Sequence, residues 1–321
     1  MQTQSARLAA LALTLLAAIP GVATSQERAR TAPGTDRTIT VAKGSRLTVS
    51  NNAGEVVLKT WDRDSLRVQA SHSPRASVDI QTTGNIVTVQ SKTGGAGGID
   101  YEITAPAWLP IKVSGTFIYI GIEGSQNEVF AETVKGDIVV KGGSGFVTAK
   151  SIQGEVIVED AKGKINASSV NESIRISGSV GEIVAETTNG DIVLNKVDAK
   201  SVEVTTVNGD VRYEGSIAAG GLYRLSTHNG DITMILPENT SATFAVRTYN
   251  GDFSSNMATK LVGELRRGRR ATYTLGAGGA DIELESFGGT IRLRRPGTVP
   301  APRERDKTKG EKEQPQEERE F

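Results

Sequence analysis

Two sets of charged residues in this chain recur with a spacing that could support surface chemistry. The first is a row of acidic residues about 18 to 21 residues apart, with one step of twice that length. It comprises Asp137, Glu155, Asp191, Asp210, Asp231 and Asp252. Neighbouring carboxylates could act as general acid and base on a polysaccharide, or hold cations. The interpretation we favour is that each carboxylate stabilises its turn and keeps the corner solvated.

The second set is basic. It comprises Arg266, Arg267, Arg269 and Arg270, with Arg292, Arg294 and Arg295 nearby in the sequence. Such a group could contact anionic lipid headgroups or an anionic polysaccharide. The simpler interpretation, which we favour, is a solvated loop.

The acidic row belongs to a longer repeat. Its last four members end the phrase Thr-x-Asn-Gly-Asp at 187–191, 206–210, 227–231 and 248–252. With the glycine as anchor, and steps of 18 residues back from Gly190, apolar rows fall seven and five residues before and two and four after each anchor. The row at minus five reads Val113, Ala131, Ala149, Ala167, Ala185, Val204, Leu225 and Val246. Such rows are typical of a repeat protein.

Polar residues alternate with these rows, so each repeat holds two short strands with one apolar face each. Asn-Gly accepts positive φ at a tight turn and is also a hairpin signal, which leaves an antiparallel meander as the alternative. A meander would need a cover for its apolar face, and no amphipathic helix is present to supply one. We therefore expect an all-β, single-stranded β-solenoid (β-helix) of about 18–21-residue coils.

A row of hydroxyl residues stands three positions before each anchor. It reads Thr133, Ser151, Ser169, Thr187, Thr206, Thr227 and Thr248. Hydroxyls stacked at a corner can bond along the stack or to the turn backbone, so we interpret the row as turn chemistry. Bulkier core residues such as Tyr213 and Phe244 predict that the coils widen toward the C-terminus.

The regions outside the repeat have different roles. Arg7 precedes the apolar run 8–19, and small residues follow at 23–25, which is typical of a secretory signal peptide over 1–25; an uncleaved anchor is the alternative. Residues 26–36 form a linker, and residues 37–110 an N-terminal β cap that closes an open edge. The regular solenoid covers 111–257, and 258–295 holds C-terminal coils and the basic loop. The charged tail at 296–321 is expected to be disordered.

Composition limits the partners. The chain has 37 basic and 37 acidic residues, so it lacks the positive charge of a nucleic-acid-binding protein. It contains no cysteine, which excludes a lipoprotein anchor. We predict no transmembrane span in the mature chain and export to the periplasm, cell envelope or extracellular space.

The segments Leu47–Asp62 and Asp100–Pro106, together with the Gly-Asp/Glu-Ile/Val turns, resemble the bacterial putative-adhesin family of exported β-solenoid proteins. The resemblance covers about residues 37–295. It implies the fold and an envelope location, and it brings no catalytic residues.

Two functions remain open. The first is a non-catalytic envelope scaffold or adhesin-like protein that presents repeated polar faces to envelope polysaccharide, an anionic surface or another envelope protein. The second is a carbohydrate-active enzyme, which would show two or three carboxylates together in a groove rather than evenly spaced ladders. We expect no catalytic residue, cofactor or metal, because the calcium-roll pattern at Gly94–Asp100 is imperfect and occurs once. The contact surface is expected at Asp191, Asp210, Asp231, Asp252 and the arginines 266, 267, 269 and 270.

Overall fold

The computed structural model describes residues 34–93, 97–264 and 270–297. Within these ranges all regular structure is β-strand, and no helix occurs. Consequently none of the described residues forms a helix that is long and apolar enough to cross a membrane. The expected signal peptide, most of the linker and nearly all of the tail lie outside the described residues.

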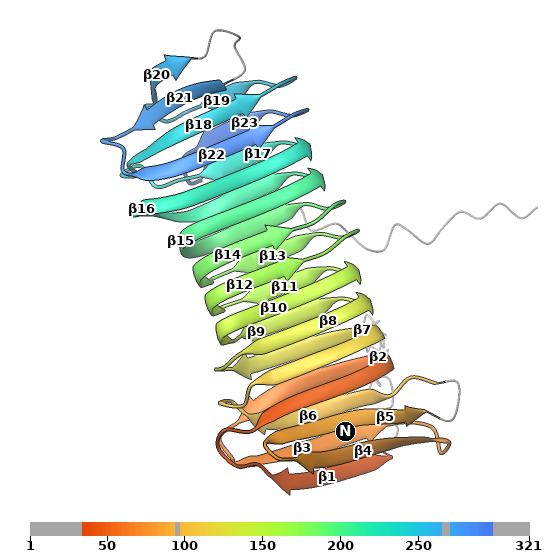
Figure 1. Cartoon of the computed structure of the whole chain (residues 1–321). Coiled ribbons are helices and arrows are strands. Elements are labelled where there is room, and N and C mark those ends of the chain that lie inside the picture. Colours follow the sequence, from red (N-terminus) through yellow and green to blue (C-terminus); the bar gives the residue numbers. More distant parts are fainter. Residues whose placement is uncertain (1–33, 94–96, 265–269, 298–321) are drawn as a thin grey trace, which may run out of the picture. The chain divides into compact units, whose positions relative to one another are not determined.

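The central part of the chain stacks strands in parallel. Its strands are β8 (Val129–Lys135), β9 (Ile138–Gly142), β10 (Ser144–Gln153), β11 (Val156–Glu159), β12 (Lys162–Ser168), β13 (Ile174–Ser177) and β14 (Val180–Glu186). One ladder runs β8–β10–β12–β14 and a second runs β9–β11–β13. Each strand pairs with the strand one coil further along (Figure 1), as in Val147↔Ile165↔Ile183. The antiparallel meander is therefore wrong for this region.

Both ladders continue through two longer strands, β15 (Ile192–Asn208) and β16 (Val211–Asn229), and through the short strand β17 (Ile232–Ile235). Here the coils are longer, and the register shifts between Asn195 and Val197 and between Ala199 and Ser201. Tyr213 and Tyr223 fill the added interior, with ring centroids 5.9 Å apart in an edge-on arrangement. Their hydroxyls donate to backbone carbonyls, so burying them leaves no polar group unpaired.

The rows expected inside are buried except in the last repeat, where Phe253 and Ser255 are half-buried. Ala131, Ala149, Ala167 and Ala185 have no exposed area, and the same holds for their partners across the core, such as Val158 and Ile176. Small residues fill these coils because the two strands of each 18-residue coil leave little space between them.

The hydroxyl row bonds to the backbone of the preceding coil, as expected from turn chemistry. Thr206 Oγ1 donates to the Gly190 carbonyl at 3.0 Å, and Thr227 Oγ1 donates to the Gly209 carbonyl at 2.9 Å. The anchor glycines, however, have another role than the one we expected. Gly209 has no positive φ; a Cβ there would lie 2.0 Å from the Gly190 oxygen. At this corner glycine is needed because the backbones of the two successive corners touch.

At the N-terminal side, chain order and stacking order differ. The strands are β1 (Thr35–Thr40), β2 (Arg46–Trp61), β3 (Ser65–Ser71), β4 (Ala76–Thr83), β5 (Ile86–Thr93), β6 (Asp100–Pro106) and β7 (Ile111–Ser125). The long strand β2 lies between β7 on one side and β5 and β6 on the other, all in parallel. Beyond them, β4 adds to β5, and β3 and β1 add beyond β6, all antiparallel.

At the C-terminal side, chain order and stacking order differ in the same way. Its strands are β18 (Ala242–Thr248), β19 (Phe253–Ser255), β20 (Lys260–Glu264), β21 (Arg270–Leu275), β22 (Ala280–Ser286) and β23 (Ile291–Arg294). The last two strands insert between the coil of β16 and β17 and the coil of β18 and β19 (Figure 1). Strands β21 and β20 then pair antiparallel beyond β18.

This insertion corrects the simple repeat order. The sequence places the corner of Gly251 directly on that of Gly230, whereas Gly289 lies between them. A Cβ on Gly289 would lie 2.0 Å from the Gly230 oxygen, and one on Gly251 would lie 2.0 Å from the Gly289 oxygen.

Candidate functional site

The acidic row forms a ladder of hydrogen bonds along the stack. In each step a carboxylate oxygen accepts the backbone N–H of the equivalent residue one coil further on. Asp191 Oδ1 accepts from the N–H of Asp210 at 2.9 Å, and Asp210 Oδ1 accepts from Asp231 at 2.8 Å. Asp137 and Glu155 are joined in the same way at 2.8 Å. These carboxylates therefore hold neighbouring coils together.

The row is not continuous. Ser173 stands between Glu155 and Asp191, and its hydroxyl accepts the Asp191 N–H at 3.3 Å. Thr290 stands between Asp231 and Asp252, because the last coil of the chain inserts there. Asp252 therefore does not adjoin Asp231, although the sequence places them one repeat apart.

Asp231 lies where the inserted coil meets the regular stack. Burial alone would raise the pKa of its carboxyl, but hydrogen bonds from the Arg292 guanidinium and the Thr290 N–H outweigh that effect, and the pKa lies below its usual value. The contacts measure 2.5 Å to Arg292 Nη1 and 2.7 Å to the Thr290 nitrogen. A carboxyl with a lowered pKa is a poor general acid.

The structure describes only part of the basic set. Arg266, Arg267 and Arg269 lie outside the described residues, while Arg270 begins β21 and is exposed. The neighbouring arginines in the sequence are engaged elsewhere. Arg292 binds Asp231, Arg294 donates to the Ser254 hydroxyl at 2.8 Å, and Arg295 pairs with Glu238 at 3.1 Å.

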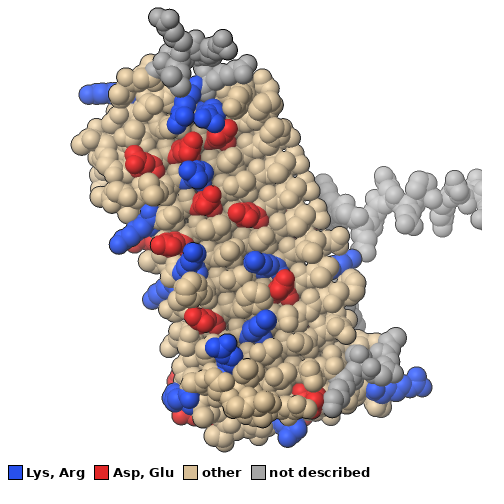
Figure 2. Space-filling view, in the orientation of Figure 1, with Lys and Arg blue, Asp and Glu red and all other residues tan. Residues whose placement is uncertain are grey.

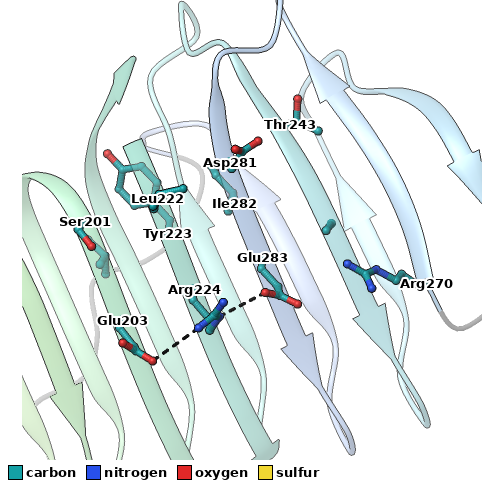
Figure 3. A pocket seen from close by; sticks show the side chains of 12 residues that line it. Ser201, Glu203, Leu222, Tyr223, Arg224, Thr243, Arg270, Asp281, Ile282 and Glu283 are labelled. Carbon is teal, nitrogen blue, oxygen red and sulfur yellow. Dashed lines mark hydrogen bonds and ion pairs between the residues drawn. The ribbon is translucent and has the colours of Figure 1, made fainter. Parts of the chain in front are cut away.

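A groove of about 450 Å³ crosses the outer face of four parallel strands at the C-terminal side (Figure 3). The register places Ser201, Leu222, Asp281 and Thr243 in one row and Glu203, Arg224, Glu283 and Ala245 in the next. Arg270 of β21 lies at its far side. The groove exists because the outward side chains at Ser201 and Ala245 are small.

A charged triad lies on the groove floor. Arg224 reaches Glu283 Oε2 at 3.2 Å through Nε and Glu203 Oε1 at 3.8 Å through Nη1. Leu222, with 59% of its surface exposed, supplies an apolar contact beside the triad. The groove therefore offers fixed charges, hydroxyls and one apolar side chain to a ligand, which suits binding of a polar molecule.

Charges of both signs are interspersed elsewhere on the face shown in Figure 2. No group of three or more metal-ligating side chains occurs among the described residues. The glycine run of the calcium-roll pattern falls partly outside them. Asp100, at its end, has a carboxylate oxygen that accepts the Glu55 N–H at 3.0 Å, in the manner of the acidic row.

Neither the groove nor the insertion of the last coil was predicted from the sequence. A signal for the second was present: Ser286 and Gly289 have the spacing of a hydroxyl and its anchor, with Ile282, Leu284, Ile291 and Leu293 at the apolar positions. The groove has no comparable signal, because it depends on which coils adjoin.

Several known proteins resemble this chain. A putative cell adhesion protein from Clostridium sporogenes is 9% identical, with a TM-score of 0.19, over 81% of this chain and 99% of that one. A putative adhesin from Parabacteroides distasonis is 12% identical, with a TM-score of 0.34, over 81% and 96%. A "putative lipid binding protein" from the same species is 12% identical, with a TM-score of 0.24, over 81% and 96%.

No curated protein matches the chain. The model of the Toastrack DUF4097 family matches residues 45–294, which is more than three quarters of the sequence and agrees with the resemblance seen in its motifs. The chain belongs to the Toastrack DUF4097 family.

Proposed function

We propose that this protein is a non-catalytic, exported cell-envelope scaffold or adhesin-like binding protein that presents repeated polar faces. Its coils are those of a single-stranded β-solenoid, residues 37–110 serve as an N-terminal cap, and residues 1–25 direct export. Its partner is envelope polysaccharide, an anionic surface or another envelope protein. The outer faces of neighbouring coils supply the contacts.

The observation that carries the proposal is that carboxylates of the acidic row are engaged in contacts within the protein. Asp191 and Asp210 accept backbone N–H groups of the next coil, and Asp231 is held by Arg292 and Thr290. Catalysis by carboxyl groups needs one that retains a proton near neutral pH, usually through a raised pKa. The lowered pKa of Asp231 is the opposite. Regular spacing instead suits many weak contacts, whose combined affinity grows with the number of coils engaged.

A carbohydrate-active enzyme is the second candidate, and one observation favours it. Glu203, Asp281 and Glu283 line one groove, as the two or three carboxylates of such an enzyme would. Arg224 lies between Glu203 and Glu283, however, and its guanidinium pairs with both carboxylates, so these two side chains are already engaged with the same partner across the groove.

Binding is tested with the purified protein lacking residues 1–25. It is presented to a glycan array, to anionic and neutral lipid vesicles, and to envelope extract. The Asp191→Asn, Asp210→Asn and Asp231→Asn variants, alone and combined, retain an amide oxygen that can accept the coil-to-coil bond while losing the charge. We expect stepwise losses of affinity if this face makes the contact.

The groove is tested separately with Leu222→Ser. Leu261→Ser is its matched control, since Leu261 is 55% exposed and lies outside the groove. The same preparations are assayed for release of sugar from polysaccharides. Turnover that disappears in Glu203→Gln or Glu283→Gln would replace the binding proposal with the enzyme.

A further inference from the structure

A row of exposed apolar side chains runs along the corner of the stack, two residues before each anchor. The exposed fractions are 41% for Val134, 45% for Ile152, 38% for Val170, 41% for Val207 and 41% for Phe287. Backbone hydrogen bonds between successive corners, such as Asn171 N–H to the Ile152 carbonyl and Asn189 N–H to the Val170 carbonyl, place them one above another. Between Val134 and Tyr249, Thr188 is the one serine or threonine in the row.

The C-terminal end of this row is aromatic. The His228 and Phe287 rings stack with centroids 4.7 Å apart and planes 9° apart, and the Tyr249 ring lies 5.1 Å from Phe287. His228 and Tyr249 are one repeat apart in the sequence, whereas Phe287 is distant from both. Phe287 lies between them because the coil of β22 and β23 inserts between β17 and β19.

A ladder of amides lies beside the apolar row, one residue closer to the anchors. Asn189 Nδ2 donates to Asn171 Oδ1 at 3.1 Å, Asn208 Nδ2 donates to Asn189 Oδ1 at 2.9 Å, and Asn229 Nδ2 donates to Asn208 Oδ1 at 2.8 Å. All four side chains are exposed. A side-chain amide has two N–H groups and two acceptor sites, so the ladder leaves hydrogen-bonding capacity on each amide for a ligand.

We call these two rows the corner strip. From Ile152 to Tyr249 the strip carries no Asp, Glu, Lys or Arg, in a chain in which 23% of the residues are charged. The carboxylates of Asp191, Asp210 and Asp231 follow two residues after the asparagines. An anionic polymer along the strip would therefore meet negative charge at successive coils.

We propose that the corner strip binds the face of an extended, uncharged polysaccharide that runs along the stack with about one sugar unit for each coil. This deepens the proposed function and rests on it. Coils are spaced by about 4.8 Å, close to the length of one pyranose unit in an extended glycan. The C–H face of the sugar packs on the apolar row and on the aromatic cluster, and its hydroxyls meet the amides.

A protein partner fits the strip less well. Stable protein interfaces bury about 800 Å² on each side. The corner strip is only about two side chains wide and extends over about eight coils, so its area falls below that value. A lipid bilayer is disfavoured as well, because its hydrocarbon would meet the amides and the adjacent carboxylates.

The experiment measures retention of the protein by chitin and cellulose particles, with soluble alginate as the anionic probe. The test variant combines Ile152→Thr, Val170→Thr and Val207→Thr. Threonine is already accommodated in this row at Thr188, so the fold is expected to persist. The matched control is Val180→Thr, because Val180 is 43% exposed and lies on β14, outside the strip. Phe287→Leu removes the aromatic stack and retains an apolar side chain.

Wild type and Val180→Thr should bind at least one neutral polymer and not alginate. The triple variant should bind that polymer at least tenfold more weakly with an unchanged melting temperature, and Phe287→Leu should fall between them. Full binding by the triple variant overturns the inference, as does wild-type preference for alginate. Concentration-dependent dimerisation that the triple variant loses would make the strip a contact between copies and also overturns it.

The outcome also separates the inference from the proposed function. If Leu222→Ser abolishes binding and the triple variant does not, the protein binds through the groove and only the corner strip is refuted. If wild type binds no polysaccharide, vesicle or envelope protein, both fail.

Discussion

The central coils and the two ends of this protein use the same strands and corners but connect them differently. Between β8 and β14, each coil lies on the coil that precedes it in the sequence. At both ends a coil from another part of the chain inserts: β2 between β7 and the pair of β5 and β6, and β22 with β23 beneath β18 and β19. The comparison shows that the repeat pattern determines the strands and corner of a coil but does not determine which other coil stacks on it.

Insertion has an energetic consequence for the ends. An open stack would present an outermost parallel coil with unpaired backbone groups, which favours edge-to-edge association. Here antiparallel strands cover β5 and β6 at one side and β18 at the other. These covering antiparallel strands are joined along the chain to the strands of the stack. The inserted coil therefore holds them against the ends.

Deletions should show the largest difference between the two regions. Removing residues 154–171 deletes one 18-residue coil and joins equivalent corners, so we expect a folded protein with parallel ladders intact. Removing residues 280–297 takes away the partner of both β16 and β18, and we expect loss of hydrogen-exchange protection throughout 242–275 and aggregation. Circular dichroism and hydrogen exchange measure both. Equal tolerance of the two deletions would contradict the inserted arrangement.

Gly289→Ala tests the inserted corner itself. Its added Cβ would lie 2.0 Å from the Gly230 oxygen, the same as the value for Gly209→Ala in a sequential corner. Backbone cannot move aside cheaply, so we expect each variant to lower the free energy of unfolding by about 3 kcal/mol or more. Gly263→Ala is the control, since open space surrounds that position. A Gly289→Ala variant as stable as the control would show that Gly289 does not stack on Gly230.

Ala185→Leu measures how narrow the central coils are. Ala185 is fully buried between Ala167 and Val204 in its row, and a larger side chain must displace backbone. We expect a loss of about 1–3 kcal/mol in the free energy of unfolding, measured by urea denaturation. Replacing its exposed neighbour with Glu186→Ala should change it little. No loss for Ala185→Leu would mean that the interior has space.

The pair of Asp231 and Arg292 should give the smallest effect, and a pH-dependent one. The folded-state pKa of Asp231 lies below the unfolded value of about 3.8, so its contribution to stability is present above that pH and is lost as the pH falls through the folded pKa. The difference in unfolding free energy between wild type and Asp231→Asn should stay below about 1 kcal/mol, because the pair is partly exposed. It should shrink below pH 3.8.

A second substitution identifies the partner. In an Arg292→Gln background the pH dependence of Asp231→Asn should largely disappear, since the guanidinium is a main cause of the lowered pKa. Persistence of the full pH dependence would assign it to another group. The pair of Arg175 and Glu155 joins two sequential coils in the same manner and provides the comparison from the central region.

The interior was predicted well from the sequence, because alternate side chains of a strand point to opposite faces and only one face is buried. Ala167 and Ala185 could be placed inside a narrow coil from their row alone. The anchors were interpreted less well: at Gly209 the requirement is contact with the backbone of the coil below, and a single sequence does not display contacts between coils. For the same reason the order of Gly230, Gly289 and Gly251 could not be obtained from their spacing.

The candidate site was less predictable than the fold. The acidic row was visible as a pattern in the sequence. Its role as a set of acceptors for backbone N–H groups depends on how each coil is positioned on the next, which the pattern does not show. The groove requires Ser201 and Ala245 to share one face although they lie more than 40 residues apart. The corner strip was present in the sequence as Val134, Ile152, Val170 and Val207, but residue type alone does not show that apolar side chains at a corner are exposed.

The position of β23 also affects how the molecule would respond to mechanical load. A pull on the chain beyond Arg295 acts on a strand that has β17 on one side and β19 on the other. The hydrogen bonds of β23 to β17 and those to β19 resist that force together, in shear along the strand axis. Were the coil of β23 the outermost one, its hydrogen bonds could open one at a time from an edge. Because the last strand lies inside the stack, a force on the C-terminal side must break its hydrogen bonds to two neighbouring strands together.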